Sequence, residues 1–109
     1  MDSDPKPELA AALELLWQRF LPETLERVAS LEAAAAACSA GTGDAEQARS
    51  AQAAAHKLAG SLGSFNLARG SILARELEVL YSGDDHPGPE LGPQLVSLAA
   101  ELRTLVEHR

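Results

Sequence analysis

The chain has 109 residues and a formal net charge of -7, with 16 acidic and 9 basic side chains. This length fits one domain, residues 1–109, that can bury a modest core without metals or disulfides. Proteins that bind the phosphate backbone of nucleic acids need clustered Lys and Arg, so the acidic balance argues against a nucleic-acid partner. Cys38 is the single cysteine, and the three histidines are widely spaced, so neither a disulfide nor a metal site is expected.

The first ten residues, MDSDPKPELA, lack the basic and apolar regions of a secretion signal. No later stretch reaches about 18 uninterrupted apolar residues, the length that a membrane-spanning helix requires. The sequence therefore predicts a cytoplasmic protein that does not insert into a membrane.

An apolar stripe at helical spacing predicts a first amphipathic helix, which Pro22 should interrupt or kink near Leu21. Its members are Leu9, Leu13, Leu16, Trp17 and Phe20. A second segment, residues 25–37, continues the stripe in register. After a loop at residues 39–43, Asp44 is suited to cap a third helix, with Gln47 three residues later as its capping-box partner.

The third helix should end near Phe65, and Asn66 should then act as a left-handed terminator or as the N-cap of the next helix. The spacing predicts a fourth helix over residues 67–81 and a final helix over residues 91–106, joined by a loop at residues 82–89. Ala and Leu dominate and aromatic residues make up 4% of the chain. We therefore expect an all-α fold, an up-and-down antiparallel four-helix bundle with a short extra N-terminal helix.

His56 lies nearly opposite the predicted core face of the third helix. That core face comprises Ala51, Ala54, Leu58, Leu62 and Phe65. The outward face around His56 is expected to carry Arg49, Gln52, Ala59, Gly60 and Gly63. Each glycine costs a helix roughly 1 kcal/mol relative to alanine, and small residues beside an exposed imidazole would let another protein close over the ring. The alternative is an ordinary surface histidine beside two glycines without a function.

The segment AHKLAGSLGSFNLARGSILARELE, residues 55–78, resembles the signature of histidine-containing phosphotransfer domains. In that family, small or apolar residues follow the phosphorylated His at fixed positions, here occupied by Leu58, Gly60, Ser61 and Phe65. Many members have Lys three residues after the His, where this chain has Ala59. Most have Gly ten residues after it, where this chain has Asn66, a residue that tolerates the left-handed backbone.

The resemblance implies that His56 accepts a phosphoryl group from a receiver-domain aspartate, or from a kinase, and passes it to another receiver aspartate. The partners would be receiver domains of response regulators and a hybrid histidine kinase. The chain would act as a monomeric phosphocarrier without catalytic activity of its own and without a cofactor, and magnesium would be held by the receiver alone. The nucleophilic atom would be Nε2 of the neutral ring.

Several side chains are candidates to support the phosphoryl group. Gln52 could orient the ring or bind the phosphoryl oxygens, whereas Lys57 and Arg49 are placed to help weakly; each also fits an ordinary exposed helix position. Trp17 and Phe20 are candidates for an apolar docking surface or for the core.

Two other functions stay open at this point. One is a helical adaptor that binds receiver domains without chemistry, which Ala59 favours. The other is the dimerising domain of a sensor kinase, but the residues after His56 lack its acidic-then-Arg-Thr-Pro pattern.

Overall fold

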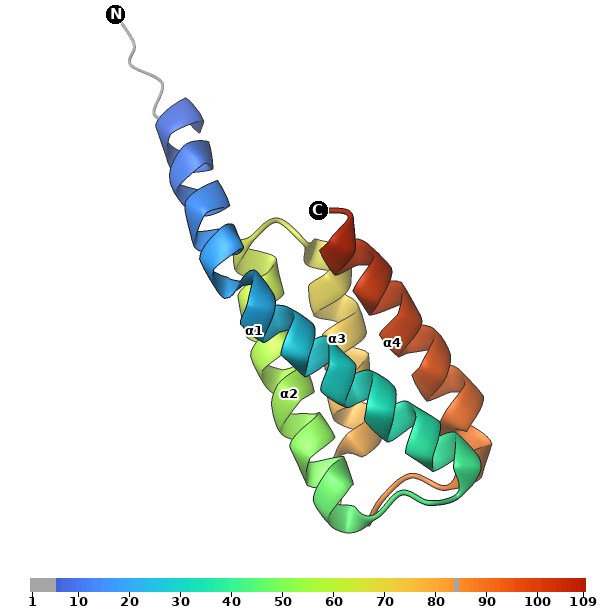
Figure 1. The fold of residues 1–109 in the computed structure, drawn as a ribbon. Helices are drawn as coiled ribbons and strands as arrows, with labels where there is room; N and C mark the ends of the chain where they lie inside the picture. Colours follow the sequence, from blue (N-terminus) through green and yellow to red (C-terminus); the bar gives the residue numbers. More distant parts are fainter. Residues whose placement is uncertain (1–5, 84) are drawn as a thin grey trace, which may run out of the picture.

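The fold is an antiparallel bundle of four α-helices, seen in a computed structural model that describes residues 6–83 and 85–109. Figure 1 shows α1 crossing in front of α2 and α3. The helices are α1 (Lys6–Ala40), α2 (Ala45–Ser64), α3 (Ala68–Tyr81) and α4 (Gly92–Glu107), with a short 3-10 helix, η1 (Pro89–Leu91), before α4. The described residues contain no β-strand, which confirms the all-α prediction.

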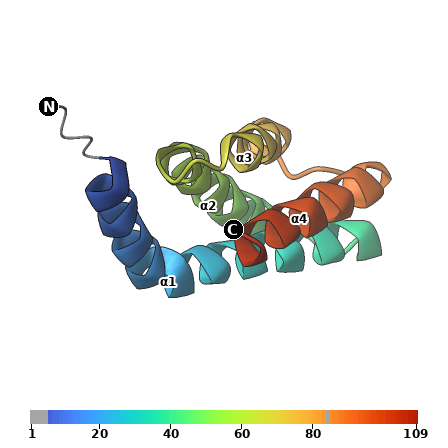
Figure 2. The same ribbon diagram turned by 90° about the horizontal axis from the view of Figure 1, so that it is seen from above.

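From Lys6 onward, the expected extra N-terminal helix is the first part of α1 and is not a separate element, so that expectation is corrected. α1 runs through Pro22 without a break, and its ribbon changes direction in the light-blue part of the helix (Figure 2). A proline inside a helix removes one backbone hydrogen bond and bends the axis. Because Trp17, Thr24 and Val28 are all buried, the helix is packed against the bundle on both sides of the bend.

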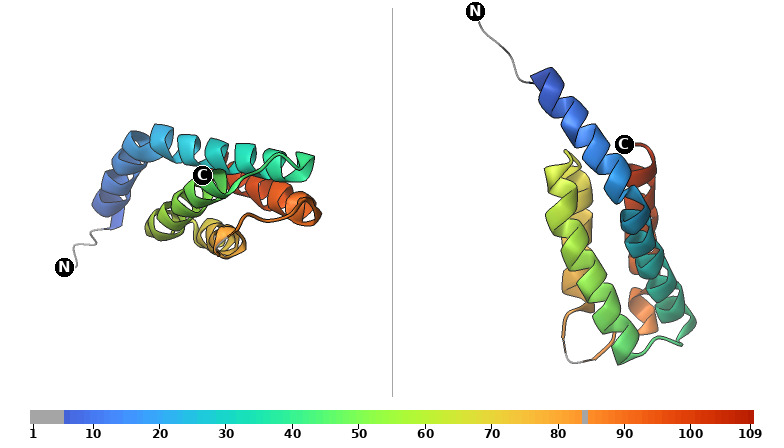
Figure 3. Two further views of the ribbon diagram at one scale, coloured as in Figure 1. Left: turned by 90° about the horizontal axis from the view of Figure 1, so that it is seen from below. Right: turned by 60° about the vertical axis from the view of Figure 1, so that its left-hand side comes forward.

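The first turns of α1 extend past the end of the bundle, as Figures 1 and 3 show. Trp17 anchors this segment: it is 3% exposed, and its ring meets that of Phe65 edge-on with 5.2 Å between centroids. The Arg109 guanidinium lies over the Trp17 ring, 4.8 Å from its centroid, and Nε of Arg109 donates a hydrogen bond to the carbonyl of Phe65. Trp17 is therefore a core residue that joins α1 to the end of α2.

Both predicted signals at the ends of α2 are confirmed. The Asp44 side chain accepts a hydrogen bond of 2.8 Å from the backbone N–H of Gln47. At the other end, Asn66 has φ of 64°, and the N–H groups of Asn66 and Leu67 return to the carbonyls of Gly63 and Leu62. This pattern is a Schellman motif, so Asn66 terminates α2, and Leu67 takes the N-cap position of α3.

Close packing of α3 against α2 depends on Gly70. A Cβ atom at this position would lie 3.1 Å from Cδ1 of the buried Leu62 and 3.7 Å from Cδ1 of Leu102. Even an alanine here would require the Leu62 side chain to shift by a few tenths of an ångström in a packed core, whereas its contact with Leu102 would be ordinary. The fully buried side chains at the centre of the bundle come from all four helices: Val28, Leu31, Leu58, Leu62, Leu73, Leu77, Leu95, Leu102 and Val106.

The segment between α3 and α4 is held against the end of α1. The thiol of Cys38 donates to the carbonyls of Pro87 and Gly88, at 3.4 and 3.2 Å. Burial raises the pKa of this thiol, so it stays protonated and acts as a packing residue and donor. Among the described residues, no helix combines the length and the apolar character needed to cross a membrane.

A bidentate ion pair links α1 to α4. Nε and Nη2 of Arg103 donate to the two carboxylate oxygens of Glu32, at 2.6 and 2.7 Å. These hydrogen bonds lower the pKa of Glu32 below its ordinary value, against the opposing effect of burial. A lowered carboxyl pKa in the folded state adds stability above the ordinary pKa, and this stability is lost as the pH falls through the folded value.

We therefore expect Glu32→Gln to reduce the free energy of unfolding at pH 7 and to have progressively less effect towards pH 3. Urea unfolding followed by circular dichroism between pH 3 and pH 7 measures this directly. Glu26→Gln, at an exposed position of the same helix, is the matched control. If Glu32→Gln lowered the free energy of unfolding equally at pH 7 and pH 3, the stability would not come from the ionised Glu32 carboxylate.

Candidate functional site

His56 lies in the middle of α2 and its side chain is 73% exposed. The exposure follows from the helical period, because Ala55 and Leu58 turn inward and are buried in the core. Of the five residues predicted to form the core face, Ala51, Leu58, Leu62 and Phe65 are buried and Ala54 is partly buried. The predicted direction of His56 is therefore confirmed.

Glu78 of α3 holds one side of the imidazole ring. Its Oε2 lies 2.7 Å from Nδ1 of His56, and its side chain is only 21% exposed. An ionised carboxylate can only accept hydrogen bonds, so Nδ1 carries the proton in this contact. The lone pair of the neutral ring then resides on Nε2, the nitrogen farther from the backbone. This is the arrangement that a nucleophilic imidazole requires.

A shallow depression of about 430 Å³ surrounds the ring. Besides His56, it is lined by Arg49, Gln52, Ala53, Lys57 and Glu78. The structure thus brings together three of the polar side chains that the sequence suggested, Arg49, Gln52 and Lys57, and adds Glu78. Two cations and an amide donor beside an open nitrogen can bind an anionic group.

The glycines leave the surface beyond His56 bare. A Cβ atom at Gly60 would meet nothing within 4 Å, and Gly63 is also exposed, with Ser71 at ordinary contact distance from such an atom. Neither glycine is required by packing or by a positive φ. Their exposure fits the interpretation that this part of α2 is kept free of side chains.

The expectation that Ala59 shares the outward face is wrong. Ala59 is 4% exposed, and its carbonyl accepts a hydrogen bond from Oγ of Ser71. The reason is tertiary: α3 packs closely along this side of α2 and covers the residue. A longer side chain at position 59 would have to displace α3 or bend out between the two helices.

Sequence reasoning missed Glu78, although a signal for it existed. Leu67 lies midway between His56 and Glu78 in the chain, next to the residue that ends α2. In a tight antiparallel hairpin, residues equidistant from the turn lie side by side. A carboxylate at this position could therefore have been paired with the histidine once the turn was placed at Asn66.

Within residues 6–83 and 85–109, no three His, Cys, Asp or Glu side chains gather in a way that could hold a metal ion. His86 lies in the exposed segment after α3, where its Nδ1 is 3.2 Å from the carbonyl of Pro87.

One family model and one curated relative match the chain. The family model for the Hpt domain matches residues 15–108. Protein RcaC of Microchaete diplosiphon is 30% identical over 106 residues, which cover 97% of this chain but 16% of that protein. The chain therefore spans about a sixth of the relative's length. No solved structure matches the chain.

The contact with Glu78 predicts the tautomer of His56. In the unmodified protein, nitrogen-15 NMR at a pH where the ring is neutral should show the proton mainly on Nδ1. Glu78→Ala removes the acceptor and should shift the population towards the Nε2–H form, while the signals of His86 stay unchanged. A dominant Nε2–H tautomer in the unmodified protein would contradict the contact.

Proposed function

Because the chain belongs to the histidine-containing phosphotransfer (Hpt) domain family of two-component phosphorelays, we propose that His56 is the residue that carries the phosphoryl group. The observation that supports this most directly is the pairing of an exposed imidazole with a partly buried carboxylate on its Nδ1 side. The ring is held and given a defined tautomer on one side, and is open to a partner on the other.

The transfer proceeds by attack of the Nε2 lone pair on the phosphorus of an aspartyl phosphate. The N–P bond forms as the bond between phosphorus and the acyl oxygen breaks, and the aspartate leaves as a carboxylate. The proton on Nδ1 stays in place, so the phosphorylated ring carries a positive charge. Glu78 stabilises this charge at close range and is a positioning residue for the ring. A second receiver aspartate takes the phosphoryl group by the reverse step.

The residues around the ring have distinct parts in this proposal. Gln52 lies one turn before His56 and can donate to a phosphoryl oxygen, and Arg49 and Lys57 lend positive charge from the same helix. Gly60 and Gly63 provide access. Ala59, being buried, shapes only the contact between α2 and α3. The chain supplies the phosphate carrier, and magnesium and the electrostatic catalysis come from the receiver.

The proposed partners are receiver domains and a hybrid histidine kinase, in the cytoplasm, with the chain acting as a monomer. The docking surface extends from the His56 face to exposed apolar side chains of α1. Phe20 is 44% exposed and its ring centroid lies 6.3 Å from that of Phe65, at the end of α2. Leu16 is also exposed on this helix. Such a patch near the end of α2 suits a partner that covers His56 and also buries apolar area.

A second candidate is an adaptor that binds receivers without chemistry. Ala59 favours it, because a buried alanine places no charge beside the ring.

The deciding experiment treats the purified chain with phosphoramidate and, separately, with a panel of phosphorylated receiver domains. Intact mass spectrometry should find one phosphoryl group added, about 80 Da, on the unmodified protein and none on His56→Gln. The adduct should be labile in acid and stable in base, as expected for phosphohistidine. Absence of any adduct with every donor would favour the adaptor.

Gly60 provides a separate test of access. Gly60→Phe should slow phosphorylation by a receiver domain by about tenfold or more, because the ring would occupy the space into which the partner must fit, an effect of about 1.4 kcal/mol or more. Phosphorylation by the small donor phosphoramidate should be slowed less than phosphorylation by the receiver domain. Ala100→Phe, at an exposed position of α4, is the control for adding an aromatic surface residue.

Gly60→Ala should raise the free energy of unfolding by about 0.5–1 kcal/mol, since the added methyl group meets open space in a helix.

If Gly60→Phe slowed phosphorylation by both donors equally, Gly60 would affect the reactivity of the His56 ring itself rather than the access of a partner protein.

A further inference from the structure

Phosphorylation of His56 would create an electrostatic problem at the site. A phosphoryl group carries close to two negative charges at neutral pH and would lie near the Glu78 carboxylate. Like charges at short range disfavour each other, and the cost is larger where a partner protein excludes water. A cation close to Nε2 is therefore needed, and position 59 on α2 holds a buried alanine.

Two contacts fix the register of α3 against α2 next to the ring. Glu78 meets His56, and two turns earlier in α3 the Ser71 hydroxyl meets the Ala59 carbonyl. Arg75 lies between Ser71 and Glu78, about 4.5 Å along the helix axis from Glu78. Because the helices are antiparallel, this level corresponds to the turn that follows His56, where Gly60 leaves open space.

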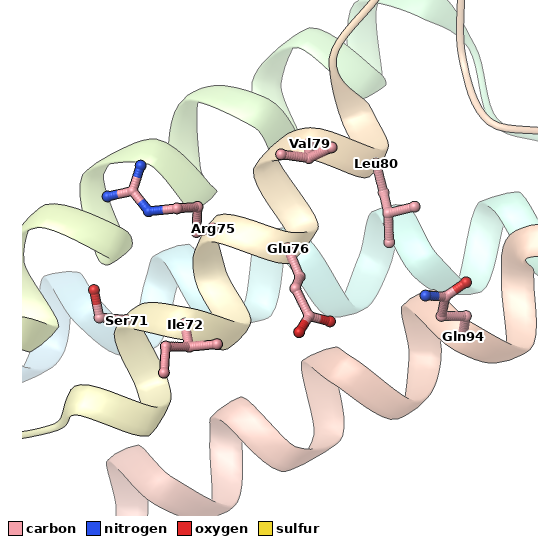
Figure 4. Close-up of a pocket in the computed structure, with 7 residues that line it drawn as sticks. All are labelled: Ser71, Ile72, Arg75, Glu76, Val79, Leu80 and Gln94. Atoms are coloured by element: carbon pink, nitrogen blue, oxygen red, sulfur yellow. The ribbon is translucent and has the colours of Figure 1, made fainter.

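Figure 4 shows the direction of the Arg75 side chain. In this view it extends from α3 in the direction of the pale green ribbon of α2. The apolar side chains of Ile72, Val79 and Leu80 line the rest of the neighbouring groove, which has a volume of about 400 Å³. Arg75 therefore lines this groove, one turn before Glu78 on the same helix.

Arg75 is an exposed cation that forms no ion pair with the described residues. By contrast, Arg69 on the same helix forms an ion pair, in which its Nε donates to the Glu101 carboxylate at 3.0 Å. The other cations near the ring come from α2 itself. Arg49 is about 10 Å before His56 along that helix, and Lys57 points about 100° away from it.

We propose that Arg75 binds the phosphoryl group on His56, reaching over from α3 across the open space at Gly60. The planar guanidinium can donate two parallel hydrogen bonds to phosphoryl oxygens. The ammonium group of Lys57 on α2 cannot donate in this parallel geometry. Arg75 would touch the transferred group itself. The inference rests on the proposed function of His56 and assigns a second helix to the same site.

The test measures the rate of phosphohistidine formation from phosphoramidate, and the half-life of the product, at low and high salt. Arg75→Gln should slow formation about fivefold at low ionic strength. The difference should shrink towards 1 M salt, where the Debye length is only about 3 Å. Arg75→Lys should restore only part of the rate, because it returns the charge without the second, parallel hydrogen bond. A purely structural role for Arg75 would not produce this salt dependence or this rescue.

Arg69→Gln is the matched control, since it removes one positive charge from the same helix at a residue that pairs with α4. It should leave the rate within twofold of the unmodified protein. Circular dichroism and thermal unfolding verify that each variant is folded.

The outcomes separate the two proposals. If the unmodified protein forms no adduct, the proposed function fails and the role of Arg75 fails with it. If an adduct forms on His56 but Arg75→Gln reacts at the unmodified rate, the role of Arg75 alone is overturned. If Arg49→Gln or Lys57→Gln lowers the rate of phosphohistidine formation more than Arg75→Gln does, the role of Arg75 is likewise overturned. The cation that binds the phosphoryl group would then belong to α2.

Discussion

The register between α2 and α3 is the constraint on which the site depends. It is set at one end by Asn66, whose left-handed backbone closes the Schellman motif, and along the interface by the close approach of Gly70 to Leu62. With this register, Glu78 arrives beside His56. A shift of α3 by one residue would rotate the carboxylate by about 100° away from the ring, so the contact between Glu78 and His56 is a consequence of helix packing.

The two nitrogens of His56 have different environments, and this division explains the choice of residue. Nδ1 meets a carboxylate that is mostly buried, whereas the ring as a whole is largely exposed. The contact of Glu78 with Nδ1 fixes the tautomer and limits rotation of the ring. Less conformational entropy of the side chain is therefore lost when a partner binds. Under the proposed function the phosphoryl group must also be passed on, and an exposed histidine on a helix lets a partner bind and leave without rearrangement of the fold.

The other interactions of the bundle keep this surface in place. Trp17, Phe65 and Arg109 fasten α1 and the C-terminus to the end of α2, and the pair between Glu32 and Arg103 joins α1 to α4. α2 and α3 can then expose their outer faces because the core is completed from the other side. Small residues at positions 60 and 63 cost helix stability, which is consistent with selection for access rather than for folding.

Periodicity and capping determined the helices, the core face of α2 and the outward direction of His56, because these depend on neighbours within one helix. The sequence also carried the family signature around His56. Tertiary structure alone decided three things: α1 continues through Pro22, Ala59 is covered by α3, and Glu78 reaches the imidazole ring. Each of these depends on how one helix packs against another, which the period of a single helix does not contain.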